Sequence, residues 1–249
     1  MALHHSLTNA GIVHDFFPAI DGRKTSPALQ DDERLDYRKT LLRHRRLLTG
    51  SEIGCYLSHY RAIKKAYSIG FQRLCLLEDD VVLEPGFADV LRALESRPEH
   101  EEMIRLMGLR MRRRKVISII GNTGHQLVRP DRGWCGTQGY VINRPGMEKV
   151  ISWAKNIFEP IDKLYDHFWE YGLQVYGIEP HVLYELDHPT SVAKSSSSPV
   201  SIPLILRLLH PIHKLFFSRS RHAYLARHHD AFEPADYPST TTGKTNRLR

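Results

Sequence analysis

The chain has 249 residues, enough for one large domain or two small ones, and its 41% hydrophobic and 25% charged residues are typical of a globular protein. No stretch approaches the ~18–20 uninterrupted apolar residues of a membrane-spanning helix, and the first residues lack the basic and apolar regions of a secretory signal. Lys and Arg exceed Asp and Glu by 35 − 28 = +7, which favours an anionic partner: nucleic acid, lipid headgroups or a phosphorylated substrate.

The predicted elements alternate along the first part of the chain. In chain order we predict an extended segment at 13–20, a helix at 49–70, a strand that starts at 73 and meets carboxylates at 78–80, a helix at 87–94, a strand at 139–143 and a helix at 144–153. Thr49 or Ser51 caps the helix at 49–70, which stops at Gly70. The alternation indicates an α/β domain with a mixed, mainly parallel sheet.

A serine-rich linker is predicted to separate a body of residues 1–193 from a basic tail of residues 194–249. Residues 202–217 mix large apolar residues with cations, a composition suited to the interface of an anionic membrane. The alternative is a pair of helices that packs on the body and breaks at Pro211.

Three cysteines, Cys55, Cys75 and Cys135, cannot all pair within one chain and have no C-x-x-C spacing. This usage is typical of the reducing cytoplasm and argues against a disulfide scaffold or a structural zinc site. We therefore expect a cytoplasmic protein, held peripherally at the inner face of the plasma membrane if the membrane interpretation of the tail is right.

Three carboxylates, Glu78, Asp79 and Asp80, follow the predicted strand at its carboxyl end. Residues i and i+2 of a strand share a face, so Glu78 and Asp80 are expected to point to one place. Neighbouring carboxylates repel unless a cation, a proton or arginines neutralise them, and Mg²⁺ and Mn²⁺ prefer oxygen ligands. Since ligands of open α/β sheets bind beyond the carboxyl ends of strands, a nucleotide-diphosphate–metal site is predicted; a solvated acidic loop is the alternative.

Residues 48–59 place a glycine-containing turn at a helix N-terminus, where free backbone N–H groups favour an anion. The Gly-Lys-Ser/Thr ending of a Walker loop is missing. An ordinary capped helix, with Cys55 and Leu57 in the core, is the alternative interpretation.

Taken together, these segments resemble glycosyltransferase family 25, the lipooligosaccharide galactosyltransferases and their relatives. The most specific part is Glu52-Ile-Gly-Cys-Tyr-Leu-Ser-His59 followed by Glu78-Asp79-Asp80, and the matching stretches in order are 17–22, 48–59, 76–81, 136–140 and 160–162. The resemblance implies a GT-A-like nucleotide-sugar-binding domain. It also implies metal-dependent, inverting transfer of a hexose, typically galactose from UDP-galactose, to a lipopolysaccharide or lipooligosaccharide core or another saccharide acceptor.

The resemblance also implies roles for individual residues. The acidic run takes the part of the Asp-x-Asp metal motif, with Asp80 as the direct ligand of Mn²⁺ or Mg²⁺, Glu78 beside it and His188 reaching the metal from the far side. Donor contacts are implied for Glu52, Ser58, His59, Glu78, Asp79, Gly136, Thr137 and Gly139. The alternatives are a helix-capping role for Glu52, a core position for His59, and a tight turn into a strand for the glycines.

Inverting transfer needs a general base that deprotonates the acceptor hydroxyl as it attacks. The resemblance implies Asp162 for this role, with Asp166 in reserve. A carboxylate after a proline turn also suits the cap of the next helix, which is the alternative for Asp162.

One departure from the family pattern concerns the start of the chain. Family members usually begin with a strand of the type Val-Ile-Asn-Leu, whereas residues 1–12 resemble the latter part of the helix after it. The expectation is a domain without its first strand, so an N-terminally truncated, non-catalytic relative that binds an acceptor or partner is the alternative function. A nucleic-acid-binding protein would need basic and aromatic residues interleaved on one face; no such stripe is present, and no nucleic-acid partner is expected.

Overall fold

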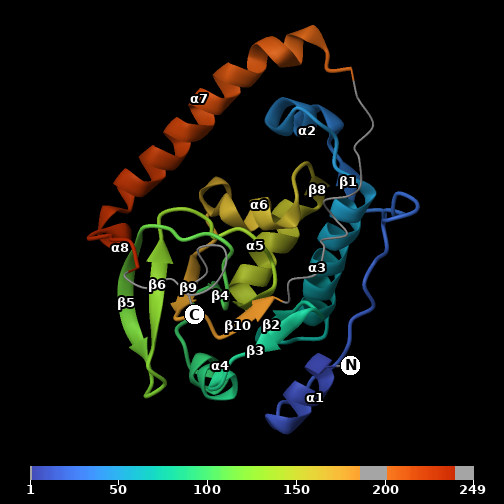
Figure 1. Cartoon of the computed structure of the whole chain (residues 1–249). Coiled ribbons are helices and arrows are strands. Elements are labelled where there is room, and N and C mark those ends of the chain that lie inside the picture. Colours follow the sequence, from blue (N-terminus) through green and yellow to red (C-terminus); the bar gives the residue numbers. More distant parts are fainter. Residues whose placement is uncertain (1, 186–200, 239–249) are drawn as a thin grey trace.

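The computed structural model of the chain describes residues 2–185 and 201–238 (Figure 1). The centre of the described part is a six-stranded sheet with the order β2-β7-β4-β9-β6-β5. Its strands are β2 (Arg73–Leu77), β7 (Gly139–Asn143), β4 (Met103–Arg105), β9 (Val175–Glu179), β6 (His125–Pro130) and β5 (Arg114–Ile120).

The sheet is mixed, as predicted, but the expected dominance of parallel pairs is wrong. Strands β4 and β9 run parallel, whereas each other pair of neighbours in the described sheet is antiparallel. Strand β2, which we expected to be parallel, pairs antiparallel with β7. An apolar run indicates that both faces of a strand are covered, but it does not indicate the direction of the strand.

Helices cover both faces of the sheet (Figure 1). On one face α3 (Gly50–Ser68), α5 (Arg144–Ala154) and α6 (Ile161–Asp166) pack in one core cluster. On the other, α1 (Ala2–Asn9) and α4 (Phe87–Glu95) pack in a second cluster. Neighbouring strand residues alternate between the clusters, for example Met103 and Ile104, as a pleated strand requires.

Two short sheets lie outside the central one. Strand β3 (Val81–Leu83) pairs antiparallel with β10 (Leu183–Glu185), which fixes the chain just after the acidic run. Strand β1 (Arg34–Leu35) pairs parallel with β8 (Asn156–Ile157).

The structure confirms the predicted helices α3, α4 and α5 and the strand β7. Thr49 caps α3, because its hydroxyl accepts from the Glu52 N–H at 3.2 Å while the Glu52 carboxylate accepts from the Thr49 N–H at 2.8 Å. The segment 13–20, which we expected to be extended, forms no strand in the structure. The predicted boundary near residue 194 and His188 lie outside the described residues.

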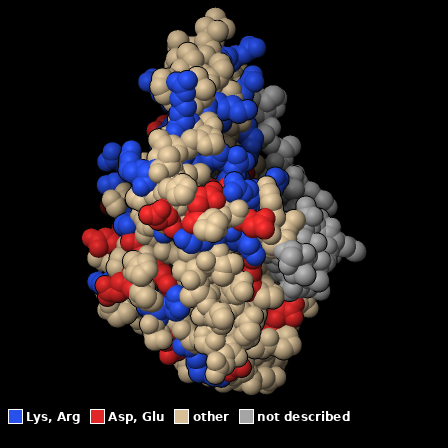
Figure 2. All heavy atoms as spheres, turned by 90° about the vertical axis from the view of Figure 1, so that its left-hand side faces the viewer, with Lys and Arg blue, Asp and Glu red and all other residues tan. Residues whose placement is uncertain are grey.

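Within the described part of the basic tail, α7 (Leu204–Arg227) is one continuous helix, so the break at Pro211 that the alternative interpretation included is wrong. Proline removes one hydrogen bond but does not end a helix whose other turns are held by neighbours. Here α2 (Tyr37–His44) and the 3₁₀ helix η1 (Phe168–Glu170) contact α7, and α8 (His229–Phe232) follows it and buries Phe232 in the core. Lys and Arg gather on the upper part of the face along which α7 runs (Figure 2).

None of the helices in the described ranges, α7 included, combines the length and apolarity that a membrane crossing requires.

A buried ion-pair network centred on Arg43 joins α2, η1 and α7. Its guanidinium donates to Glu159 Oε2 at 2.9 Å and to both oxygens of Glu170 at 2.7 Å, and its central carbon lies 4.6 Å from the ring centre of Phe217 on α7. His167 Nδ1 lies 2.8 Å from the same Glu159 oxygen. Burial alone would raise the pKa of Glu159, but His167 and Arg43 hold it below its usual value.

Replacing Arg43 by Ala should therefore lower the free energy of unfolding by about 3–5 kcal/mol, because it leaves Glu159 charged and buried without its main cation. Arg38→Ala is the matched control, since Arg38 is exposed on the same helix and should change stability by no more than about 0.5 kcal/mol. Urea unfolding of both variants measures the difference, and equal stabilities would refute the role of the network.

The same network predicts a pH dependence of stability. The lowered pKa of Glu159 contributes stability above the pKa of the unfolded chain, and this contribution is lost as the pH falls through the folded value. In Arg43→Ala the free energy of unfolding should therefore fall less at acidic pH than it does in the wild type. Urea unfolding over a series of pH values measures this difference.

Candidate active site

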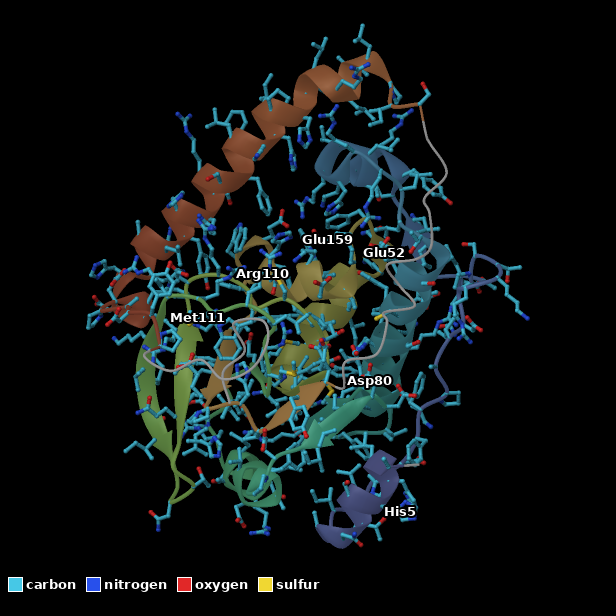
Figure 3. The ribbon with its side chains drawn as sticks, in the orientation of Figure 1. His5, Glu52, Asp80, Arg110, Met111 and Glu159 are labelled. Atoms are coloured by element: carbon cyan, nitrogen blue, oxygen red, sulfur yellow. The ribbon has the colours of Figure 1, made fainter. Side chains whose placement is uncertain are left out.

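The acidic run forms the turn between β2 and β3, on the side of the molecule where α3 runs (Figure 3). Asp79 is exposed, and Asp80 is half-buried. Burial raises the pKa of Asp80, and the neighbouring carboxylates of Glu78, Asp79 and Glu185 raise it further. The Oδ1 atom of Asp80 is buried and has no hydrogen-bond partner in the described part of the chain. The described surroundings of Asp80 therefore disfavour its charged form.

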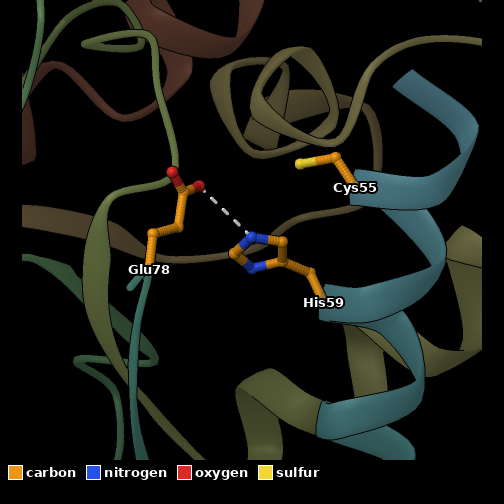
Figure 4. A group of neighbouring side chains, drawn as sticks. All are labelled: Cys55, His59 and Glu78. Atoms are coloured by element: carbon orange, nitrogen blue, oxygen red, sulfur yellow. Dashed lines mark ion pairs between the residues drawn. The ribbon is translucent and has the colours of Figure 1, made fainter. Parts of the chain in front are cut away.

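Glu78 is held by α3 and by the loop before β7 (Figure 4). Its Oε1 atom lies 3.4 Å from His59 Nε2 and accepts a hydrogen bond from the hydroxyl of Thr137. Burial would raise the pKa of Glu78, but His59 and Thr137 bring it below its usual value. Ligand atoms of Glu78, His59 and Cys55 lie within 4.8 Å of one another, whereas Asp80 belongs to no such cluster within the described ranges.

His59 is a buried residue whose two ring nitrogens both have partners. Its Nδ1 atom lies 3.0 Å from the Tyr140 hydroxyl, which lies 3.0 Å from the hydroxyl of Tyr165 on α6. This chain of contacts connects Glu78 across the core to α6. His59 is thus a core residue, as the alternative interpretation proposed, and it also lies beside the acidic run.

The loop before β7 is fixed by Arg105, which is 2% exposed. The guanidinium donates to the carbonyl oxygen of Cys135 at 3.2 Å and to that of Gly136. Cys135 and Gly136 have φ values of 61° and 77°. Both values lie in the left-handed region, which favours glycine, the residue found at position 136. Arg105 thereby sets the position from which Thr137 reaches Glu78.

Gly139 has a packing role in the structure. A Cβ atom there would lie 2.7 Å from a methyl carbon of Leu183 and 2.9 Å from one of Leu77. The absence of a side chain lets β7 pass between these two leucines, a packing role that differs from the tight turn proposed as the alternative for this glycine.

The two candidate bases lie in different environments on α6. Asp166 is buried: its Oδ1 accepts from the Cys135 N–H at 3.1 Å and lies 3.9 Å from the Arg105 guanidinium, and its Oδ2 lies 3.3 Å from Lys163 Nζ. Asp162 has a side chain that is 25% exposed and lies 3.5 Å from Lys163 Nζ. Asp166 therefore supports the loop around Cys135, and Asp162 is the more accessible carboxylate.

Cys55 shows that the predicted site residues converge. Burial raises the pKa of its thiol to about 12, and the negative charges of Glu78, Asp162 and Glu52 add to the shift. The three carboxylates come from the turn after β2, from α6 and from α3, so the fold brings together residues that are far apart in the sequence. Nothing in the sequence distinguishes Cys55 from a core residue, because an uncharged cysteine behaves as a small hydrophobic side chain.

Glu52 and Ser58 hold the start of α3 and the segment before it. Besides capping the helix, Glu52 accepts from Arg46 through both carboxylate oxygens, at 2.7 and 2.5 Å. The Ser58 hydroxyl donates to the Gly54 carbonyl at 2.7 Å and accepts from the Ile20 N–H at 2.8 Å. The capping alternative for Glu52 is confirmed, and Ser58 ties the segment at 17–22 to the helix.

The backbone of residues 17–22 approaches α3 closely at glycine positions. A Cβ atom on Gly54 would lie 2.4 Å from the Ile20 carbonyl oxygen, and one on Gly22 would lie 1.8 Å from the Gly50 carbonyl oxygen. These distances are too short for any side chain, so the motif glycines allow the close approach.

Gly54→Ala should therefore destabilise the protein by about 1–3 kcal/mol, although alanine normally stabilises a helix interior by about 1 kcal/mol over glycine. Ser68→Ala on the exposed end of α3 is the control, with an expected change within about 0.5 kcal/mol. Thermal unfolding compares the two, and a gain in stability for Gly54→Ala would contradict the packing.

The sequence interpretation missed Arg105, Lys163 and the Tyr140–Tyr165 pair. A charged residue between apolar neighbours in the strand around 103–107 was an available signal for Arg105, because a buried charge requires partners. Lys163 and the tyrosines offered none, since their contacts arise from packing of α6 against the sheet.

Comparison with known proteins adds the family context. A sequence model of the family described as "Glycosyltransferase family 25 (LPS biosynthesis protein)" matches residues 2–165, a range that includes Glu52, Asp80 and Asp162.

Three curated proteins illustrate the similarity. The chain is 35% identical over 91 residues to a glycosyltransferase 25 family member of Aedes aegypti, which covers 34% of this chain and 14% of that protein. It is 26% identical over 160 residues to procollagen galactosyltransferase 1 of Danio rerio, a match that covers 57% of this chain and 26% of that protein. It is also 26% identical over 152 residues to the probable inactive glycosyltransferase 25 family member 3 of Bos taurus, which covers 54% of this chain and 25% of that protein.

The matched parts thus span about a quarter or less of these relatives. The family model, in contrast, matches well over half of this chain, from the first helix to the candidate base. The chain belongs to glycosyltransferase family 25.

Proposed function

We propose that this family 25 protein is a metal-dependent, inverting glycosyltransferase with a GT-A-like donor site. It moves a hexose, galactose from UDP-galactose, onto a hydroxyl group of a saccharide acceptor such as a lipopolysaccharide or lipooligosaccharide core. The observation that carries the proposal is the buried Oδ1 atom of Asp80, which has no hydrogen-bond partner among the described residues and lies near the carboxylates of Glu78, Asp79 and Glu185. The galactosyl donor is supported by the procollagen galactosyltransferase named among the relatives.

The residues at this position fit a hard divalent cation. Carboxylate oxygens are the ligands that Mn²⁺ and Mg²⁺ prefer, and a cation would stabilise the charged form of Asp80, which burial disfavours. Asp80 would hold the ion, with Glu78 in support from its position against His59 and with His188 as a further ligand. When bound, the ion supplies positive charge to the diphosphate of the donor and of the departing UDP.

The proton transfer in this proposal belongs to Asp162. Its carboxylate accepts the proton of the acceptor hydroxyl while that oxygen forms its bond to the anomeric carbon and the bond from this carbon to UDP breaks. Partial exposure leaves the Asp162 carboxylate reachable by an acceptor, and Lys163 Nζ lies 3.5 Å from it. Asp166 acts as a positioning residue through Cys135 and Arg105.

The donor-binding part of the proposal comprises the remaining predicted residues. Thr137 and His59 orient Glu78, and Gly136 with the Arg105-held loop offers backbone close to the same carboxylate. Glu52 and Ser58 fix the start of α3, and Asp79 is exposed at the turn. Gly139 lets β7 pass close to Leu77 and Leu183.

Release of UDP tests the proposal. The full chain is incubated with UDP-galactose, UDP-glucose or UDP-N-acetylglucosamine and with a lipopolysaccharide core or a procollagen peptide as acceptor. We expect UDP release from UDP-galactose that EDTA stops and added Mn²⁺ restores. Full activity in EDTA would refute the metal, and UDP binding without release from any donor would favour the alternative of a non-catalytic relative, the property in the name of the bovine protein.

A further inference from the structure

The outer face of α7 carries a continuous apolar stripe. Its members are 40% to 62% exposed and recur every three or four residues: Ile205, Leu208, Leu209, Ile212, Leu215 and Phe216. At 1.5 Å per residue the stripe is about 18 Å long. A continuous exposed apolar patch of this kind marks an interaction surface rather than scattered surface residues.

The opposite face of α7 holds the helix on the body, and this fixes the outward direction of the stripe. His210 Nδ1 lies 2.7 Å from the Leu42 carbonyl oxygen, Phe217 lies under Arg43, and the Tyr224 ring is centred 5.9 Å from that of Phe168. Residues 210, 217 and 224 are seven positions apart and therefore share one side of the helix. The stripe cannot turn inward without breaking these contacts.

Cations accompany the stripe. Arg219 lies three positions after Phe216 and four after Leu215 and therefore shares the side of the stripe. Arg207 and Lys214 lie three positions before and four after His210, towards the inner side of the helix, and Leu204–Arg227 contains no Asp or Glu. Figure 2 shows Lys and Arg concentrated on the upper part of this face, with Asp and Glu lower on the molecule.

We propose that the outer face of α7 docks on a membrane surface that contains anionic phospholipid. The helix lies along the interface, with the leucines and Phe216 at the acyl boundary and Arg219 on the phosphates. A second copy of the chain fits this face less well, because a two-fold contact would bring the same cations against one another. The inference stands independently of sugar transfer.

Vesicle flotation with the full chain tests the proposal. We expect binding to vesicles of phosphatidylcholine with roughly one-third phosphatidylglycerol at about 0.1 M salt, and weak binding to pure phosphatidylcholine. At ~1 M salt, where the screening length falls to about 3 Å, the binding should drop severalfold.

Matched variants identify the face. Leu208→Ser with Phe216→Ser should weaken binding about tenfold or more, whereas Ile119→Ser, on β5 and 66% exposed, should leave it unchanged. Arg219→Gln should weaken binding to the anionic vesicles by about fivefold, whereas Lys214→Gln, on the inner side of the helix, should weaken it less. Thermal unfolding of each variant checks that the body remains folded.

Three results would overturn the inference. They are no binding of the wild type to anionic vesicles, unchanged binding of the Leu208 and Phe216 variant, and a dimer in sedimentation equilibrium that this variant dissociates while vesicle binding is absent. The last result would assign the face to self-association instead.

Discussion

Asp80→Asn is expected to abolish metal-dependent UDP release and, at the same time, to make the metal-free protein more stable. Burial and the carboxylates of Glu78, Asp79 and Glu185 raise the pKa of Asp80 in the folded state. A raised pKa means that ionisation opposes folding, so the metal-free wild type should lose stability as the pH rises from the unfolded pKa towards the folded one. Asparagine keeps the shape and removes this loss, together with the ligand.

Thermal unfolding with and without Mn²⁺ separates the two effects. In the wild type, Mn²⁺ at about 100 times its Kd should stabilise the fold by about 2.7 kcal/mol, and in Asp80→Asn this gain should vanish. Asp89→Asn on α4 is the control, because Asp89 is an exposed carboxylate paired with Arg92 and should keep both the Mn²⁺ response and the activity. A variant of Asp80 that still responds to Mn²⁺ would remove the metal role from this residue.

Asp162→Asn is expected to lower kcat by about 10²–10⁴-fold, the usual contribution of a general base, with little change in the affinity for UDP-galactose. The carboxylate is partly exposed, and its side-chain contact in the described structure is Lys163 at 3.5 Å. Its replacement should therefore leave the fold intact. Single-turnover transfer and donor titration measure the two quantities separately, and unchanged turnover would reject Asp162 as the base.

Asp166→Asn provides the comparison, because the same substitution acts there on structure. Asp166 is buried against Arg105, Lys163 and the Cys135 N–H, so the neutral variant leaves the buried Arg105 guanidinium without this counter-charge. We expect a lower unfolding temperature and a weaker donor affinity from the disturbed loop. A variant that is as stable as the wild type and loses only kcat would instead transfer the base role to Asp166.

Local sequence signals predicted most of the elements that flank the site. Thr49 and Glu52 form a capping box that depends only on residues three apart, and α3 begins where the box places it. Strand β7 and helix α5 follow directly from an apolar run and from Asn143 with Pro145 at a helix start. The acidic run likewise lies at the carboxyl end of its strand, as its apolar approach predicts.

Strand direction and the course of the tail could not be obtained in the same way. The run before Glu78 is apolar because helices cover both faces of the sheet, and this holds for either direction of β2. Pro211 predicts a break, yet contacts of α7 with Arg43 and Phe168 on distant segments stabilise one helix through it.

The sequence alone determined which residue types surround the candidate site and which elements carry them, because caps, apolar periodicity and motif spacing are local properties of the chain. Only the tertiary structure decided their partners: Glu78 contacts His59 and Thr137, and Asp166 contacts Arg105. It also buries one oxygen of Asp80 without a hydrogen-bond partner in the described ranges. These outcomes depend on burial and on contacts between segments far apart in the chain, and such contacts form only when the sheet and its helices pack.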